Sequence, residues 1–328
     1  MARTYLTPSL DRAAQRSPLI KKAIWGAEYA CLATFWGFCR LVPPRIASAI
    51  GHRLVWSYAP RLSKFGHSVR NLSIAFPGKS QGEITDLARQ SWAATGRVLA
   101  EYPHVRKICT RSDQEGTELL VDNEVEALLR DGKPIMFITA HIGNWELAAG
   151  VIAHRLKLPL SVIYSPQQNP YIARMVLGMR RGLACELIEK RNSIRGSLTA
   201  LGKGRSIGML IDTRSDEGEL VPFFGIDAMT SLVPARLAVR MKVPMVPVRV
   251  ERREGARFRI HLMKPIPLCP EARDERETAL ALTKAILSHY ETWISEQPGD
   301  WLCSKRRWPK GASPRAAASK AVTSDASA

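Results

Sequence analysis

The middle of the chain alternates short apolar runs with longer stretches of helical spacing. The apolar runs have the length of buried strands and occupy residues 134–139, 160–164, 206–211 and 244–250. Apolar side chains recur at helical spacing between and after them, near residues 145–155, 170–182, 192–201 and 234–241. This alternation predicts an α/β fold with a mixed, largely parallel sheet and helices on both of its faces.

Longer elements flank this core. Residues 83–107 have the spacing of one long amphipathic helix, and residues 275–296 predict another. Residues 257–263 predict an antiparallel strand at the edge of the sheet. Beyond Trp308 the chain becomes rich in Ala and Ser, which is typical of a disordered tail.

An apolar run near the N-terminus, residues 23–39, has Glu28 as its only charge and basic residues on both sides. It is marginal for a membrane span, which needs about 20 apolar residues, and its flanks lack the asymmetry of the positive-inside rule. A helix lying in the membrane interface, with Trp25, Tyr29 and Trp36 near head-group depth, fits better than a span or a buried helix. The sequence thus divides into a basic segment with a membrane-anchoring helix (1–60), a main domain (61–310) and an Ala/Ser-rich tail (311–328).

The charge of the chain is strongly positive. There are 48 Lys+Arg against 30 Asp+Glu, which gives a net charge of +18 and a pI of about 10.0. Such a field concentrates polyanions, so nucleic acid, anionic lipid and an acidic protein partner all fit the charge alone. The basic residues lack the glycine-aromatic signature of common RNA-binding modules, which argues against nucleic acid.

Several common motifs are absent. Gly78-Lys79-Ser80 resembles the end of a phosphate-binding loop, but Ser73 stands where that motif needs glycine. The chain has neither a G-x-S-x-G nucleophile motif nor the H-E-x-x-H zinc motif, and its six cysteines form no CxxC pair. The sequence therefore disfavours nucleotide hydrolysis, serine esterase chemistry and zinc hydrolysis, and it predicts no metal or nucleotide cofactor.

Candidate chemistry lies at the end of the first predicted strand. His141 follows the apolar run, and a short turn with Gly143 and Asn144 leads to Glu146 at the start of a helix. Ligand sites in open α/β sheets lie beyond the carboxyl ends of strands. With the turn between them, Glu146 can fold back on the imidazole, fix its tautomer and raise its basicity. His141 would then serve as general base towards a substrate hydroxyl; a strand-end histidine beside a helix-capping glutamate is the alternative.

Four stretches of the chain resemble one enzyme family. They read ITAHIGNWELAAG, GMLIDTRSDEGELVPFFG, ARLAVRMKVPMVPV and WLCSKRRW, in the family's order and with its separations. The chain resembles the lipid A biosynthesis acyltransferases, the lauroyl/myristoyl transferases of the lysophospholipid acyltransferase superfamily, over roughly residues 23–309. The resemblance implies a glycerolipid-acyltransferase-like fold and makes residues 61–310 the acyltransferase domain. It also implies acyl–acyl carrier protein as donor, an anionic glycolipid acceptor, and work at the cell inner membrane with the catalytic domain facing the cytoplasm.

The resemblance also carries over to single residues. The family's H-x4-(D/E) motif corresponds to His141 and Glu146, and its Asp-Gln pair corresponds to Asp212, followed here by Thr213 instead of Gln. A segment that often begins with Arg before Asn-Pro begins here with Ser165. These two departures concern recognition of the acceptor.

Other residues near these motifs have two interpretations each. Arg214 follows a strand end, where it can contact a phosphate or pair with a nearby carboxylate. Phe223 and Phe224 can line an acyl-chain cavity or pack in the core. Asn144 and Asn169 can orient the acceptor hydroxyl or cap helices.

The resemblance, taken with the residues around His141, implies an enzyme that acylates a hydroxyl of a lipid A precursor, with His141 as base. The same chemistry on another membrane lipid, such as a lysophospholipid or an ornithine-type lipid, is the nearest alternative. A basic, non-enzymatic protein that binds membrane or nucleic acid is the alternative of a different class.

Overall fold

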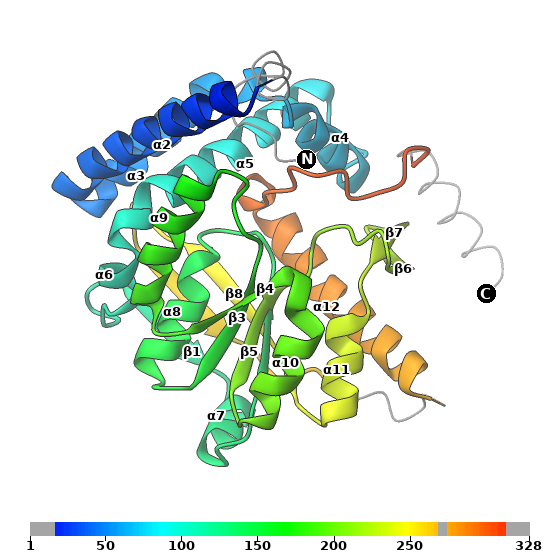
Figure 1. The fold of residues 1–328 in the computed structure, drawn as a ribbon. Coiled ribbons are helices and arrows are strands. Elements are labelled where there is room, and N and C mark those ends of the chain that lie inside the picture. The colour runs from blue at the N-terminus through cyan, green and yellow to red at the C-terminus, as the bar shows by residue number, and fades with distance from the viewer. Residues whose placement is uncertain (1–16, 268–273, 313–328) are drawn as a thin grey trace.

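A seven-stranded sheet forms the centre of the computed structural model, which describes residues 17–267 and 274–312 (Figure 1). Its strands are, in spatial order, β1 (Thr117–Val121), β9 (Phe258–Leu262), β8 (Met245–Arg252), β2 (Met136–Thr139), β5 (Ser206–Leu210), β3 (Leu160–Tyr164) and β4 (Glu186–Glu189). Every neighbouring pair is parallel except β8 with β9. The predicted mixed, largely parallel α/β sheet is therefore confirmed.

The prediction for residues 257–263 was wrong in one respect. β9 is antiparallel to β8 as expected, but β1 pairs with its other side, so β9 is not an edge strand. The two true edges, β1 and β4, were not predicted from the sequence. Both are short and contain glutamate, and their partly exposed side chains do not form the apolar run of a buried strand.

The helices cover both faces of this sheet. They are α2 (Pro18–Leu41), α3 (Pro44–Tyr58), α4 (Phe65–Ala75), α5 (Gln81–Glu101), α6 (Val105–Cys109), α7 (Asn123–Arg130), α8 (Glu146–Arg155), α9 (Pro170–Arg180), α10 (Ser193–Gly202), α11 (Val233–Met241) and α12 (Glu275–Glu296). Met136 and Ile138 of β2 pack with α10, α11 and α12, whereas Phe137 packs with α6, α7 and α8. Successive side chains of a strand point to opposite faces, so one strand serves two cores.

The long helix predicted over residues 83–107 is divided in the structure. Ser80 and Glu83 form a capping box that begins α5, which runs to Glu101. A 3-10 turn, Tyr102–His104, then leads into the short α6. Pro103 lies in that turn, and its ring and missing N–H are poorly tolerated inside an α-helix.

The N-terminal apolar run forms α2, which lies with α3 against the α5 side of the molecule (Figure 1). Among residues 17–267 and 274–312, none of the helices combines the length and the hydrophobicity of a transmembrane span. Trp36, expected near head-group depth, does not face outwards: it is buried, stacks on Tyr102, and donates its indole N–H to the Leu99 carbonyl at 2.7 Å. Most of the expected tail, residues 313–328, lies outside the described residues.

Two features outside the main sheet reach the site described below. β6 (Glu219–Phe223) and β7 (Ile226–Thr230) form an antiparallel hairpin that the sequence did not predict. After α12, the chain returns past the end of β2, where Ile142 and Trp301 form an isolated antiparallel bridge. This returning C-terminal segment therefore lies beside the residue that follows His141.

Candidate active site

His141 lies just beyond β2, and the register of the sheet decides what faces it. β2 pairs with β5 so that Thr139 is opposite Leu210. Two residues further along each parallel strand, the same register brings His141 opposite Asp212. The Nδ1 atom of His141 lies 2.7 Å from Oδ1 of Asp212. A carboxylate only accepts, so Nδ1 carries the proton and Nε2 has the free lone pair.

Asp212 is almost fully buried, with a side chain that is 1% exposed. Its Oδ2 accepts the backbone N–H of His141 at 3.1 Å and the indole N–H of Trp301 at 3.0 Å. Together with the imidazole, three donors hold the carboxylate in one orientation. Such a carboxylate stays ionised and fixes both the position and the tautomer of the histidine.

The pKa values of this pair are shifted in opposite directions. The protein around the imidazole lowers the pKa of His141 by disfavouring its charged form, but the charge and hydrogen bond of Asp212 outweigh this, so the pKa is raised above 6.5. Burial raises the pKa of Asp212, but His141 and the other donors outweigh it, so the pKa is lowered below 3.8. The pair therefore combines an ionised carboxylate with an imidazole of increased basicity.

The backbone around His141 is held on several sides. Tyr290 donates its hydroxyl to the Thr139 carbonyl at 2.6 Å, and the N–H of Leu302 donates to the His141 carbonyl at 2.8 Å. Gly143 has a φ of +61°, and a Cβ there would lie 2.5 Å from the Val250 carbonyl oxygen, so only glycine fits. The imidazole side chain itself is 27% exposed and lies edge-on to Trp145. A rigid backbone thus presents a ring that substrate can reach.

Glu146 occupies a different position from the one predicted. It does not hydrogen-bond the imidazole: its carboxylate accepts two bonds from Arg180, at 2.6 and 3.1 Å, and one from the Tyr102 hydroxyl at 2.8 Å. Glu146 and Arg180 are only 12% and 13% exposed. Glu146 still adds to the negative charge that raises the pKa of His141, though less than Asp212 does. Sequence distance suggested Glu146 as the carboxylate partner of His141, but Asp212 has that role in the structure.

Asn144 and Asn169 are both fully buried and bonded to protein groups. Asn144 donates to Glu101 at 2.8 Å, and Glu101 forms a buried ion pair with Arg252. Asn169 caps α9 by accepting the backbone N–H groups of Tyr171 and Ile172. Its amide also donates to α2, at the Trp25 carbonyl and the Glu28 carboxylate. The expected capping is present for Asn169, whereas Asn144 fixes the turn after His141 to α5.

The two phenylalanines differ in their surroundings. Phe223 is fully buried, stacks on Trp308, and has the guanidinium of Arg307 5.0 Å from its ring centre. Phe224 is half-buried, has a φ of +51°, and packs edge-on against Phe76. Core packing thus accounts for Phe223, and only Phe224 has exposed surface.

Arg214 lies two residues beyond Asp212. Its Nε is 2.6 Å from Oδ1 of Asp216, whose side chain is 84% exposed, so the ion pair proposed as its alternative is the one observed. An exposed carboxylate holds an arginine only weakly. Arg214 thus remains near the site with a partner that an anion can displace.

Sequence reasoning did not identify Arg180, Tyr102 and Trp301 as parts of this site. Trp301 lies in the stretch WLCSKRRW, which carried the family resemblance but did not point to a contact with Asp212. Arg180 is six residues from Arg174 in an ordinary amphipathic helix, and nothing in the local pattern distinguishes it. Their positions follow from the packing of α9 and of the returning C-terminal segment against the end of β2.

Comparison with known proteins identifies the family of this chain. The family described as bacterial lipid A biosynthesis acyltransferase matches residues 15–310. A curated "Lipid A biosynthesis acyltransferase" of Haemophilus influenzae is 21% identical over 293 residues, which cover 86% of this chain and 87% of that protein. The matched residues include every strand of the main sheet as well as His141, Asp212 and Trp301. The chain therefore belongs to the bacterial lipid A biosynthesis acyltransferase family, and it is an acyltransferase.

Proposed function

We propose that this enzyme transfers a fatty acyl chain from acyl–acyl carrier protein to a hydroxyl of a lipid A precursor, with His141 as general base. The observation that carries the proposal is the short contact between His141 Nδ1 and the buried carboxylate of Asp212, 2.7 Å, beside an accessible imidazole. This arrangement leaves Nε2 to accept a proton from the acceptor. No side-chain nucleophile is required.

The proposed reaction is a direct transfer. Nε2 of His141 takes the proton of the acceptor hydroxyl as its oxygen bonds to the thioester carbonyl carbon. The tetrahedral intermediate then collapses, the C–S bond breaks, and the leaving thiolate takes the proton from the imidazolium. Asp212 stabilises the imidazolium while it exists and keeps Nε2 directed at the substrate.

The family and the charge of the chain support this choice of donor and acceptor. The family acts in lipid A biosynthesis, so an acyl donor and a lipid acceptor are required. An acidic carrier protein and an anionic glycolipid both suit a chain with a net charge of +18. We assign the enzyme to the cytoplasmic face of the inner membrane, where both would meet it.

Purified enzyme provides the direct test of this function. It should transfer the acyl group of acyl–acyl carrier protein to a lipid A precursor, and mass spectrometry should show the mass of one added chain. Lipid A from cells lacking the protein should lack that chain. Normal lipid A in those cells, together with no transfer in vitro, would contradict the assignment.

We further propose that α2 lies on the membrane by one exposed face, which is apolar apart from Thr34. The exposed residues of this face recur every three or four positions and are Leu19, Ala23, Ala27, Ala30, Thr34, Phe38 and Leu41. That spacing forms one stripe without a charge along a helix of 24 residues, roughly 36 Å. Lys22 and Arg40 lie on one flank of it. A largely apolar stripe with basic residues beside it is typical of an interfacial helix.

Two acidic residues on this stripe should release the enzyme from membranes. Both sites of Ala27→Glu/Ala30→Glu are exposed, so the fold should be kept. Binding to vesicles with anionic lipid should fall by roughly tenfold or more, because each charge opposes an anionic surface by about 1 kcal/mol. Sedimentation with vesicles measures this.

A matched control places the same charges elsewhere. Ser288→Glu/Thr292→Glu lies on exposed positions of α12, away from α2 (Figure 1). It should reduce binding much less. Equal losses in the two variants would mean that net charge, and not the α2 stripe, governs attachment.

We assign Glu146 a role in holding Arg180, and charge neutralisation tests it. Glu146→Gln leaves the guanidinium of Arg180 buried without its anion, which should lower the free energy of unfolding by on the order of 3 kcal/mol. Activity should fall with it. Glu146→Gln/Arg180→Met removes both charges and should regain much of the lost stability in thermal melts. A double variant less stable than Glu146→Gln would show that the two residues do not act as a pair.

A further inference from the structure

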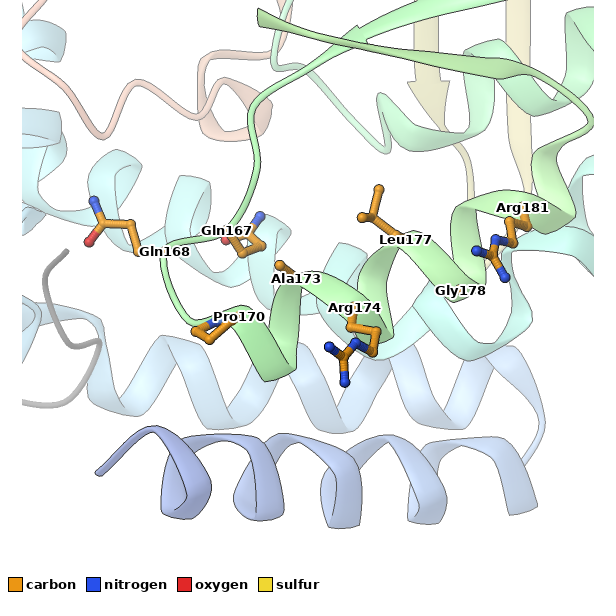
Figure 2. A pocket seen from close by; sticks show the side chains of 8 residues that line it. All are labelled: Gln167, Gln168, Pro170, Ala173, Arg174, Leu177, Gly178 and Arg181. Atoms are coloured by element: carbon orange, nitrogen blue, oxygen red, sulfur yellow. The ribbon is translucent and has the colours of Figure 1, made fainter. Parts of the chain in front are cut away.

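A groove runs along the outer side of α9 and has no assigned role. Its volume is about 420 Å³, which is within the range of small-ligand sites. The lining side chains extend from Gln167 to Arg181 (Figure 2). Pro170, Arg174 and Gly178 recur every four residues and share one face of α9, and Arg181, the residue that ends the helix, continues the same spacing. Most of the groove is thus formed by α9, and Gln167 and Gln168 of the preceding loop complete it.

Two guanidinium groups in the groove have no carboxylate partner among the residues that the structure describes. Arg174 and Arg181 are exposed, and neither forms an ion pair with any described residue. The neighbouring Arg180 is different, since it points inwards and pairs with Glu146. Seven residues separate Arg174 from Arg181, roughly 10 Å along the helix axis. The two side chains can therefore bind one anionic group from two sides.

Gly178 forms the floor between these arginines. A Cβ added there would meet no atom within 4 Å, so the glycine leaves open space and is not required by packing. Apolar lining from Pro170, Ala173 and Leu177 adjoins the guanidinium groups. Cationic and apolar surface side by side suits an amphiphile with an anionic head.

The groove adjoins a smaller hollow, and the helix that carries the groove is bonded to α2. A smaller hollow shares Gln167, Ala173 and Leu177 with it and is lined also by Arg180, whose guanidinium binds Glu146. At the start of α9, Asn169 bonds to α2, the helix with the exposed stripe. The groove therefore begins beside the helix that we propose to lie on the membrane.

We propose that the groove along α9 binds the phosphate-bearing head group of the acceptor lipid, with Arg174 and Arg181 as its anion-binding side chains. This rests on the proposed function in one respect, that the acceptor is an anionic lipid. The size of the hollow and its apolar lining favour a lipid head group over the surface of an acidic protein. The groove would hold the phosphate end while the acceptor hydroxyl lies at Nε2 of His141.

A binding experiment tests the groove without catalysis. Dodecyl phosphate, below its micellar concentration, is titrated into the full chain by calorimetry, with dodecyl maltoside as the uncharged comparison. Arg174→Gln/Arg181→Gln should weaken dodecyl phosphate binding roughly 10-fold or more. Arg195→Gln/Lys203→Gln removes the same charge from exposed positions around α10 and should change it by less than about twofold. Equal affinities in wild type and Arg174→Gln/Arg181→Gln would overturn the proposal.

Kinetics then distinguish lipid from carrier protein. With a phosphorylated lipid A precursor, Arg174→Gln/Arg181→Gln should raise the acceptor KM roughly 10-fold or more and leave kcat and the donor KM nearly unchanged. With the dephosphorylated precursor it should behave as wild type. Gly178→Leu fills the groove and should raise the acceptor KM for both precursors. A rise in the donor KM instead would mean that the groove docks the carrier protein.

Failure of the two proposals is distinguishable. If wild-type enzyme acylates neither precursor, the proposed function is wrong, and the dodecyl phosphate titration still decides whether the groove binds a phosphate amphiphile. If wild type acylates both precursors with equal KM, the function stands and the phosphate site is refuted.

Discussion

Replacing His141 with alanine should lower kcat by roughly 10²–10⁴-fold, the usual effect of removing a positioned general base. Nε2 is the atom that accepts the proton of the acceptor hydroxyl. Among the described residues, no second side-chain base is hydrogen-bonded to Asp212. The fold should survive, because the ring is partly exposed and Asp212 keeps its bonds to the backbone of residue 141 and to Trp301. Initial rates of acyl transfer at saturating donor measure the loss.

The control is a histidine remote from the site. His67 is exposed on α4, so His67→Ala should retain the wild-type rate and thermal midpoint. Circular dichroism must show that His141→Ala is folded. A folded His141→Ala enzyme with wild-type kcat would refute the mechanism.

Asp212→Asn should also lower kcat, by roughly 10²–10⁴-fold, although it keeps the shape of the side chain. The reason is the number of donors around the carboxylate. If the amide nitrogen faces Nδ1, the imidazole must carry its proton on Nε2 and loses its basic atom. If the amide is flipped, its nitrogen faces the backbone N–H of His141 and the indole N–H of Trp301, and these two donors then have no acceptor. Either orientation impairs the site.

The pH dependence separates this effect from simple loss of structure. Because the neutral imidazole is the base and its pKa is raised, the ascending limb of kcat/KM in wild type should lie above pH 6.5. Asp212→Asn removes the charge that raises this pKa, so the limb should move to lower pH, with a lower plateau. An unmoved limb would mean that Asp212 does not act on His141.

The same shifts make stability depend on pH. His141 has a folded pKa above its unfolded value, so its contribution is full below about pH 6.5 and is lost as the pH rises through the raised pKa. Asp212 has a lowered folded pKa, so its contribution is present above about pH 3.8 and is lost as the pH falls. The thermal midpoint of wild type should therefore exceed that of Asp212→Asn by the largest margin between about pH 3.8 and pH 6.5.

The buried strands and their neighbouring helices could be predicted because their signal is local. β3 and α12 have the bounds that their apolar spacing predicted, and β2, β5 and β8 differ by a few residues. Each is long enough or apolar enough to show its period within one window of the sequence. β1 and β4 are neither long nor strongly apolar, so the edges of the sheet could be identified only in the structure.

The partner of His141 could not be predicted because it depends on the order of strands. Glu146 is near in sequence and was the natural candidate, whereas Asp212 is near only because β5 lies beside β2 in register. Sequence alone does not say which predicted strands are neighbours. The family motif did mark Asp212, but as part of a segment for substrate binding, since nothing local connects it to His141.

The returning C-terminal segment has a consequence for how the enzyme comes into being. Trp301 bonds Asp212, Leu302 bonds His141, and the buried Arg307 and Trp308 close over the β6–β7 hairpin. During synthesis, β2 and β5 emerge from the ribosome long before these residues do. A nascent chain that already holds both His141 and Asp212 therefore lacks the indole and the backbone amide that fix them. Translation must pass residue 308, and the ribosomal tunnel must release it, before the catalytic pair is complete, so a chain stalled late in translation should be inactive.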